Sequence, residues 1–255
     1  MVALVTGASA GIGRDIARSL AMHSIDLIIT ARRKDRLDEL KNELKEKYGV
    51  RVKAITADLT SVSQCKELHR RVQKYGIDIF INNAGMGVFG DFTKTDLDRE
   101  LDMIHLNIRA FHVLFKLFLQ DFEKRGGGYI MNTASSAAFF AGPMFASYYA
   151  TKAYVLRMSQ AVNEELRHKR SGVYVSVLCP GPVETEFMER SGARFSVPPK
   201  SSEYVAEYAV REMFGGRFLL LPSFTDKASA VLGKLVPDSI SAYAVRLIQS
   251  HREEL

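Results

Sequence analysis

The chain begins with the run VALVTGASAGIGRDIARSLA, which spans residues 2–21. Its first five residues are apolar or β-branched, which is typical of a short buried strand. A glycine-rich segment follows at 7–13, and the apolar residues after it recur at the spacing of an amphipathic helix. A strand, a glycine turn and a helix in this order form the first part of a βαβ unit that binds a dinucleotide.

The glycine turn has a physical reason in such a unit. Glycines let the backbone turn sharply and approach a pyrophosphate closely, and the N-terminus of the following helix favours the negative charge. The spacing here is G-x-x-x-G-x-G, which differs from the G-x-G-x-x-G pattern. A glycine turn alone is weak evidence, so the interpretation depends on the rest of the chain.

Strand and helix patterns alternate along the remaining sequence. Strands are predicted at 2–6, 25–30, 51–57, 77–81, 129–133, 173–178 and 217–221. Helices are predicted after the glycine turn and at 35–48, 62–75, 97–124, 148–170 and 201–214. No change of composition divides the chain. We therefore predict one α/β domain over 1–255, a single-domain Rossmann fold with a doubly wound parallel sheet of about seven strands and helices on both faces, and a helical extension from about 223 to 255.

Composition limits the possible functions. With 255 residues, 47% of them hydrophobic, the chain can fill a large core. The net charge of +6 comes from 35 basic and 29 acidic residues that are interspersed, so we expect no nucleic-acid partner. Two cysteines do not suggest a disulfide framework, and the histidines lack the spacing of metal ligands, so we expect no metal. No stretch approaches the ~20 apolar residues of a transmembrane segment, and the N-terminal residues lack a signal-peptide pattern. These features favour a cytoplasmic protein.

Two arginines, Arg32 and Arg33, directly follow the second predicted strand. A carboxylate at this point binds the ribose 2′-hydroxyl of NAD, whereas arginine can pair with the 2′-phosphate of NADP. The first carboxylate here is Asp35, so the sequence favours NADP(H) over NAD(H), with Arg32 as the first phosphate contact and Arg33 as the second. Alternatively, both arginines only begin the charged helix at 35–48.

Polar residues also follow the third and fourth predicted strands. Asp58, followed by Leu59, could hydrogen-bond an adenine edge, or it could cap the next helix, a task that Ser61 or Ser63 could share. The segment 82–85, Asn-Asn-Ala-Gly, stands at the carboxyl end of a strand, which is where open parallel sheets bind ligands.

The segment 135–152 carries the side chains best suited to catalysis. Ser135 follows the fifth predicted strand, and an apolar loop leads to Tyr148 and Lys152 at the start of a helix. Residues four apart share one helix face, so the Lys152 ammonium can lie beside the Tyr148 phenol and lower its pKa from the usual ~10. Tyr148 could then donate and accept a proton. Alternatively, the two residues form an ordinary surface pair.

Together these features resemble the short-chain dehydrogenase/reductase family. The matching residues are Thr6, Gly7, Gly11 and Gly13 of the turn, Asp58, Asn82 to Gly85, Asn107, Ser135, Tyr148, Lys152, Pro180 and Gly181. The resemblance implies that Tyr148 is the general acid or base and that Ser135 hydrogen-bonds the substrate oxygen. It implies that Lys152 holds the nicotinamide ribose and lowers the pKa of Tyr148. Asn107, which is otherwise an amide in an apolar helix, would anchor a water that connects Lys152 to solvent.

The resemblance also implies the residues that contact the cofactor. They are Gly7, Ser9, Ala10, Gly11, Ile12 and Gly13 at the phosphates, Arg32 and Arg33 at the 2′-phosphate, Asp58 and Leu59 at the adenine, Asn83, Ala84 and Gly85 at the adenine ribose, Tyr148 and Lys152 at the nicotinamide ribose, and Pro180, Gly181, Val183 and Thr185 around the nicotinamide. One departure is Ala10, because many NADP-using members carry a basic residue within the turn. The preference for NADP(H) then rests on Arg32 and Arg33.

The resulting hypothesis is an NADP(H)-dependent oxidoreductase (EC 1.1.1.-) that transfers a hydride between the nicotinamide and a carbonyl or secondary alcohol. Two alternatives are a 3-oxoacyl-[acyl-carrier-protein] reductase-like enzyme and a non-catalytic NADP(H)-binding regulatory protein. Segments 86–92, 139–145 and 186–199 predict an apolar substrate pocket. The apolar helix at 97–124 suggests a homodimer or homotetramer. The extension could pack on the core, cover the pocket or make peripheral contact with a membrane.

Overall fold

A single seven-stranded sheet forms the centre of the computed structural model, which describes residues 1–192 and 198–250, without the side chains of 248–250. All neighbouring strands are parallel, in the order β3-β2-β1-β4-β5-β6-β9. The strands are β1 (Val2–Thr6), β2 (Asp26–Ala31), β3 (Val52–Thr56), β4 (Ile79–Asn82), β5 (Gly128–Thr133), β6 (Val173–Leu178) and β9 (Leu219–Leu220). The chain moves outward from β1 to β3 and then crosses back to β4, which creates a switch point between β1 and β4. The predicted doubly wound Rossmann fold is confirmed.

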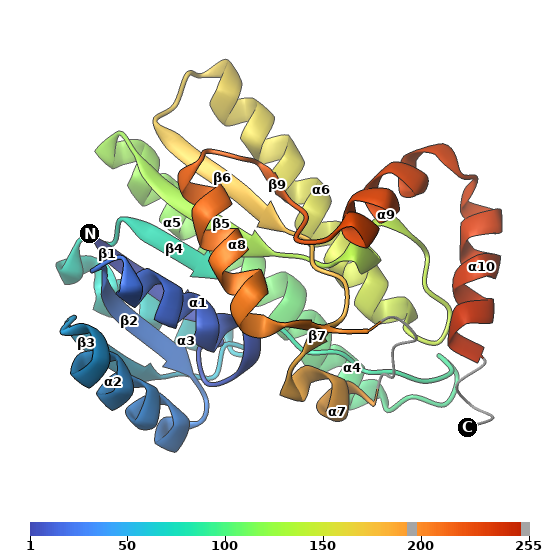
Figure 1. The fold of residues 1–255 in the computed structure, drawn as a ribbon, viewed down its shortest axis with the longest axis horizontal. Helices are drawn as coiled ribbons and strands as arrows, with labels where there is room; N and C mark the ends of the chain where they lie inside the picture. Colours follow the sequence, from blue (N-terminus) through green and yellow to red (C-terminus); the bar gives the residue numbers. More distant parts are fainter. Residues whose placement is uncertain (193–197, 251–255) are drawn as a thin grey trace.

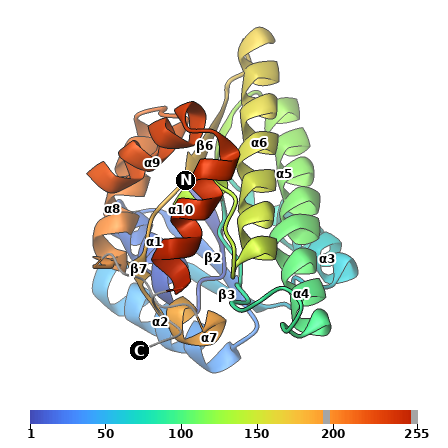
Figure 2. The same ribbon diagram turned by 90° about the vertical axis from the view of Figure 1, so that its right-hand side faces the viewer.

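Helices cover both faces of this sheet (Figure 2). One face carries α1 (Gly11–Met22), α2 (Lys34–Tyr48) and α8 (Ser202–Phe214). The other carries α3 (Val62–Val72), α5 (Phe111–Arg125) and α6 (Ala146–His168). Because both faces are covered, the central strands are apolar along nearly their whole length, as expected for a parallel sheet.

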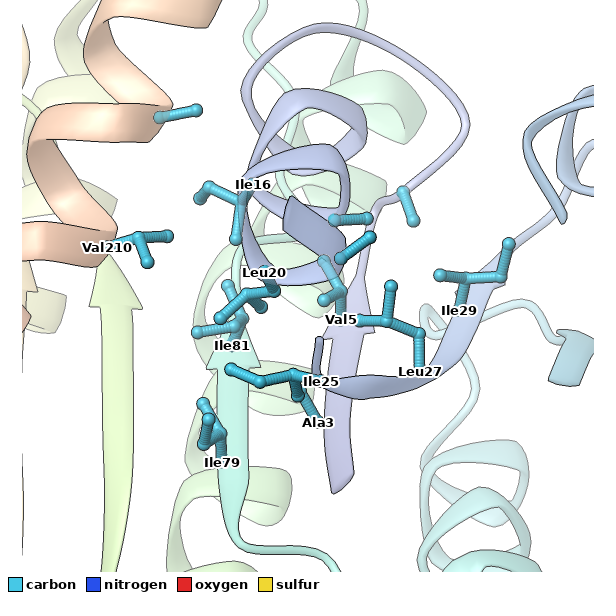
Figure 3. Packing of buried hydrophobic residues seen from close by; sticks show 14 of the residues in the cluster. Ala3, Val5, Ile16, Leu20, Ile25, Leu27, Ile29, Ile79, Ile81 and Val210 are labelled. Carbon is cyan, nitrogen blue, oxygen red and sulfur yellow. The ribbon is translucent and has the colours of Figure 1, made fainter. Parts of the chain in front are cut away.

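Alternate strand residues fill two separate cores. Ala3 and Val5 of β1 face α1 and α8, whereas Leu4 between them faces α3 and α5. Figure 3 shows the first core, in which Ile16 and Leu20 of α1 lie against the sheet. Its labelled members are Ala3, Val5, Ile16, Leu20, Ile25, Leu27, Ile29, Ile79, Ile81 and Val210. The period-2 alternation of a strand therefore ties both helical layers to one sheet.

The helical stretch predicted at 97–124 is continuous but not uniform. It consists of α4 (Leu97–Ile104), a π-helical turn (His105–Ala110) and α5. The π turn contains the buried Asn107. A π turn adds one residue to the helical repeat and is often found at functional sites.

The loop predicted after β6 contains some regular structure. Within it, β7 (Val183–Glu184) pairs in parallel with β8 (Lys200–Ser201), and α7 (Glu186–Ser191) lies between them. Part of the predicted substrate segment at 186–199, namely 193–197, lies outside the described residues. The loop after Ser135 also contains a 3-10 turn, Ser136–Phe139.

The C-terminal extension forms α9 (Phe224–Leu235) and α10 (Asp238–Ser250). Figure 1 shows both helices at the side of the molecule toward which the strand arrows point. Val245 of α10 and Ser229 of α9 line the cleft described below, so the extension covers part of it. No helix within 1–192 and 198–250 is long and apolar enough to cross a membrane.

Candidate active site

A cleft of about 760 Å³ runs along the carboxyl ends of the strands. It lies where open parallel sheets bind ligands. Of the predicted catalytic and cofactor-binding residues, every one except Asn107 lines it: Gly7, Ser9, Ala10, Gly11, Ile12, Gly13, Arg32, Arg33, Asp58, Leu59, Asn83, Ala84, Gly85, Ser135, Tyr148, Lys152, Pro180, Gly181, Val183 and Thr185. The structure thus brings together residues from both halves of the chain.

The glycine turn between β1 and α1 requires glycine for two different reasons. Gly7 and Gly11 have φ angles of +68° and +53°, which side chains rarely adopt. At Gly13, a Cβ would lie 2.5 Å from the Gly7 carbonyl oxygen, so the turn could not close on the helix. The backbone of the turn is therefore exposed to the cleft without side chains in the way.

The N-terminus of α1 is suited to an anion. Its N-cap is Ala10, and among the described residues no side chain caps this end and no acidic residue lies in its first turn. The first N–H groups of a helix lack internal partners and carry partial positive charge. Together with the glycine turn, this end of the cleft fits the pyrophosphate of a dinucleotide.

Thr6 and Asn83 join the turn to the end of β4. The Thr6 hydroxyl donates to the Ile81 carbonyl at 3.1 Å and accepts from the backbone N–H groups of Asn83 and Ala84 at 2.9 and 3.1 Å. The Asn83 amide donates to the Thr6 carbonyl at 3.0 Å. The side-chain NH₂ group of Asn83 thus holds the glycine turn in place, and the ribose contact of Asn83 stays a prediction.

Arg32 and Arg33 differ in their surroundings. Arg33 forms an ion pair with Glu186 of α7 at 2.8 Å and donates to the Ser9 hydroxyl at 3.1 Å. Arg32 is exposed at the edge of the cleft and has no ion-pair partner among the described residues. Glu186 was not identified from the sequence, because it lies 153 positions from Arg33 and has no local signal.

Asp58 does not cap α3. Ser61 is the N-cap, and its hydroxyl accepts from Gln64 N–H at 3.4 Å. Asp58 Oδ1 accepts from the backbone N–H and the hydroxyl of Thr60 at 3.1 and 2.9 Å. The carboxylate is thereby fixed at the edge of the cleft beside Leu59.

Ser135, Tyr148 and Lys152 meet at the other end of the cleft. The Ser135 hydroxyl lies within hydrogen-bonding reach of the Tyr148 phenol and donates to the Pro180 carbonyl at 3.3 Å. The Lys152 ammonium lies 5.8 Å from the centre of the Tyr148 ring and donates to the Thr133 carbonyl at 2.9 Å. Tyr148 and Lys152 are 8% and 5% exposed, so the pair is a buried feature and not a surface pair.

Burial controls the ionisation of both side chains. It raises the pKa of the Tyr148 phenol above its usual value, and the hydrogen bond with Ser135 opposes this rise only in part. Burial also lowers the pKa of Lys152 to about 8. The sequence led us to expect a lowered pKa for Tyr148. The direction in the protein alone is the reverse, because the desolvation of a buried phenolate outweighs the hydrogen bond with Ser135.

Asn107 lies beneath the cleft floor. Its Oδ1 accepts from Met86 N–H at 2.9 Å, and its Nδ2 donates to the Met86 carbonyl and the Thr151 hydroxyl at 2.8 and 3.0 Å. A Cβ on Gly85 would lie 3.2 Å from Asn107 Oδ1 and 3.4 Å from Lys152 Nζ, so the three residues are neighbours. Both polar atoms of the side chain have protein partners, so the predicted water contact would have to come from the Asn107 backbone.

An apolar pocket adjoins Tyr148. The Phe145 ring stacks on Tyr148 with ring centres 4.4 Å apart, and the Phe187 ring of α7 lies 5.4 Å from it. Val88 and Phe89 complete this cluster. The sequence predicted an apolar pocket from these segments, but not that Phe187 would lie against the catalytic candidate.

Asp226 is a further residue of the cleft that the sequence did not identify. It is 4% exposed, and its carboxylate accepts from the Ser223 N–H at 3.0 Å and from the Gly181 backbone. Burial raises the pKa of this carboxyl above its usual value. Asp226 thereby attaches α9 to the loop that carries Pro180 and Gly181.

Comparison with known proteins identifies the family. Residues 1–194 match the model of the short chain dehydrogenase family. An uncharacterized oxidoreductase of Staphylococcus saprophyticus is 32% identical over 83% of this chain and 91% of its own length. The human very-long-chain 3-oxoacyl-CoA reductase is 34% identical over 72% of this chain, which spans 60% of that protein's length.

A solved structure shows the same relationship. The short-chain dehydrogenase of Sphingobium yanoikuyae, in complex with NADPH, is 32% identical, covers 92% of this chain and 93% of its own, and superposes with a TM-score of 0.84. The family match covers the glycine turn, the Tyr148 and Lys152 pair, and all of the cleft except the part that the C-terminal extension lines. The chain therefore belongs to the short-chain dehydrogenase/reductase family, whose members are oxidoreductases that act on carbonyl and alcohol groups.

Proposed function

We propose that the protein is an NADP(H)-dependent reductase of ketones or aldehydes in which Tyr148 is the general acid. The observation that carries this proposal is the convergence of Ser135, Tyr148 and Lys152 at one end of a cleft whose other end is a glycine turn. A bound nicotinamide supplies the hydride in the reductive direction and accepts it in the reverse direction. Residues of this chain donate the proton, stabilise the developing negative charge and hold the proton donor in place.

Tyr148 donates its phenolic proton to the carbonyl oxygen as that oxygen becomes negative. Its raised pKa keeps the phenol protonated at neutral pH, which suits reduction. Ser135 shares the cleft with the phenol and donates a hydrogen bond to the same oxygen, where the negative charge develops. Proton transfer by a positioned acid of this kind contributes roughly 10²–10⁴-fold to a rate.

Lys152 and Asn107 support the proton donor. The Lys152 ammonium holds the ribose hydroxyls of the cofactor, and its charge favours the tyrosinate that remains after proton transfer. Asn107 holds Met86 at the edge of the cleft and, through the backbone of the π turn, anchors a water that connects Lys152 to solvent. Thr133, whose carbonyl accepts from Lys152, fixes the direction of the amine.

NADP(H) is the cofactor that the arginines favour. Arg32 is exposed at the end of β2, so its guanidinium can pair with a 2′-phosphate. The similar Sphingobium protein was solved with NADPH, which supports the same choice. Asp58 and Leu59 then lie at the adenine, and Pro180, Gly181, Val183 and Thr185 at the nicotinamide.

The substrate is an apolar carbonyl compound. Phe145 and Phe187 line the cleft beside Tyr148, so a bulky apolar group can bind next to the reacting carbonyl. The human relative acts on very-long-chain 3-oxoacyl-CoA, by its name. That similarity keeps a 3-oxoacyl thioester reductase as the second candidate, whether the acyl group is carried by coenzyme A or by a carrier protein.

The test is a panel of ketones, aldehydes and 3-oxoacyl thioesters, in which the change in NADPH absorbance measures the turnover of each compound. Tyr148→Phe should lower turnover by at least about 10²-fold because it removes the proton donor, while NADPH binding, followed by nucleotide fluorescence, persists. Tyr154→Phe is the matched control, since Tyr154 lies on the same helix and its hydroxyl bonds His112 at 2.7 Å instead. Full turnover by Tyr148→Phe would contradict the assignment. Nucleotide binding with no turnover of any substrate would favour the non-catalytic regulatory protein.

A further inference from the structure

We propose that Glu186 is a specificity-determining residue that weakens the preference for NADP(H) over NAD(H) by competing with the 2′-phosphate for Arg33. The inference rests on the proposed function, because it concerns the same cofactor site. The contact joins Arg33 and Glu186, which are 153 positions apart in the chain.

The contact spans the cleft between its two rims. Arg33 stands directly before α2, and Glu186 begins α7, yet the guanidinium and carboxylate are 2.8 Å apart. The second terminal nitrogen of Arg33 donates to the Ser9 hydroxyl at 3.1 Å. Arg33 therefore connects the glycine turn, the end of β2 and α7 in a fixed position.

The charge of Arg33 is thus already matched by a carboxylate. Arg33 and Glu186 are 27% and 37% exposed in their side chains, so the pair is screened only in part. A 2′-phosphate at Arg33 would have to displace Glu186 or bind beside it. Either way the carboxylate and the phosphate compete for one guanidinium, whereas a 2′-hydroxyl carries no charge and does not need that ion pair. Arg32, which has no carboxylate partner among the described residues, remains the unopposed phosphate contact.

Glu186 has a second partner that provides a control. Arg190, one turn further along α7, pairs with the same carboxylate oxygen at 3.1 Å. Arg190→Ala removes that pair and leaves the contact with Arg33. An effect that belongs to the Arg33–Glu186 pair should therefore appear in Glu186→Gln and not in Arg190→Ala.

The experiment measures dissociation constants of NADPH and NADH by nucleotide fluorescence for the wild-type protein, Glu186→Gln, Arg33→Ala, the double variant and Arg190→Ala. Circular dichroism checks that each variant is folded. Removing the charge of Glu186 should tighten NADPH binding by about two- to fivefold, the range of a partly exposed ion pair, and leave NADH binding unchanged. In the Arg33→Ala background the same substitution should have no effect on NADPH, because the two side chains act as a pair. Arg32→Ala should weaken NADPH binding in every background.

Four results would overturn the inference, and the simplest is that Glu186→Gln leaves NADPH binding unchanged. Equal changes in NADPH and NADH binding would make Glu186 a general structural support. A selective loss of NADPH binding in Glu186→Gln would mean that Glu186 orients Arg33 for the phosphate. The same gain in Arg190→Ala would place the effect elsewhere on α7. If the wild-type protein binds neither nucleotide, the proposed function itself fails. If it binds both nucleotides and Glu186→Gln changes nothing, only the inference about Glu186 fails.

Discussion

Lys152 carries a charge in a place that does not favour it. Burial lowers its pKa from 10.5 to about 8, so a folded chain at neutral pH bears the cost of a buried ammonium. Between these two values only the unfolded chain binds the proton. The free energy of unfolding that depends on Lys152 is therefore lowest below pH 8 and rises as the pH increases toward 10.5.

Lys152→Met isolates this contribution. Relative to Lys152→Met, the free energy of unfolding of the wild type should rise by about 2 kcal/mol between about pH 7 and about pH 9.5. Over this range the wild-type lysine loses its buried charge, whereas methionine has no charge to lose. Urea unfolding at several pH values measures this difference. Lys116→Met, at an exposed position of α5, is the control for the loss of a lysine side chain that is not buried. A constant difference between Lys152→Met and the wild type would mean that the lysine is not buried as a cation.

Single residues of the site could be predicted where the reason for them is local. Tyr148 and Lys152 stand four apart on one helix, and the structure places both in the buried end of the cleft. Arg33 and Glu186 could not be paired in advance, because nothing near either residue indicates a partner 153 positions away. The direction of the Tyr148 pKa was also out of reach, because its burial depends in part on Phe187, which belongs to a distant segment.

At the scale of elements, the turn between β1 and α1 is the most constrained part of the site. Its closure brings Gly13 against the Gly7 carbonyl and the Asn83 amide, which leaves no room for a Cβ. Asn83 in turn holds Thr6 at the end of β1. The turn, the strand end and the following loop therefore move together or not at all.

Gly13→Ala should lower the free energy of unfolding by about 1–3 kcal/mol, as overpacking does, and weaken nucleotide binding more than about tenfold because the turn must shift. Chemical denaturation and nucleotide fluorescence measure the two effects. Gly49→Ala is the control: Gly49 has a φ angle of +69° but nothing within 4 Å of a Cβ. That control should lose stability through backbone strain and keep its affinity. If both variants keep their affinity, the turn does not hold the nucleotide.

Most elements could be predicted because their signals are local, while departures from regular geometry could not. Strand β6 and the start of α3 fall at the predicted residues, since apolar runs and periodic spacing identify them. The π turn at His105–Ala110 has the same apolar pattern as an α-helix, so the sequence does not distinguish the two. The pairing of β7 with β8 is two residues long, which is too short for a recognisable strand pattern.

On the scale of the whole molecule, the N-terminal and C-terminal parts of the chain contribute to opposite ends of the cleft. The N-terminal glycine turn lies at one end, and the C-terminal extension braces the other. Asp226 of α9 accepts from Gly181, and the α9 residue Gly233 lies against Phe139, in the 3-10 turn after Ser135. The sequence left open whether the extension packs on the core, covers the pocket or touches a membrane. The structure shows that it covers part of the cleft, through contacts between residues far apart in the chain.

This arrangement predicts that α9 can be disturbed without harm to the phosphate end. At Gly233 a Cβ would lie 2.5 Å from the Phe139 carbonyl oxygen and 2.8 Å from its Cβ, so Gly233→Val must push α9 away from the turn that follows Ser135. We expect kcat/KM to fall by at least about tenfold, since small displacements of catalytic groups are costly. Binding of an adenosine nucleotide with a 2′-phosphate but no nicotinamide should stay within about twofold, because its contacts lie at the other end.

Calorimetric titration of that nucleotide and NADPH-linked turnover separate the two ends of the cleft. Gly215→Ala, after α8, is the control, because a Cβ there would meet nothing nearer than 3.4 Å. It should leave both measurements unchanged. Equal loss of nucleotide binding and turnover in Gly233→Val would show that the extension supports the whole fold. Unchanged turnover would show that Ser135 and Tyr148 keep their geometry without α9, and the extension would then have to act through its exposed apolar side chains, such as Phe224 and Leu235, on a partner subunit or a membrane surface.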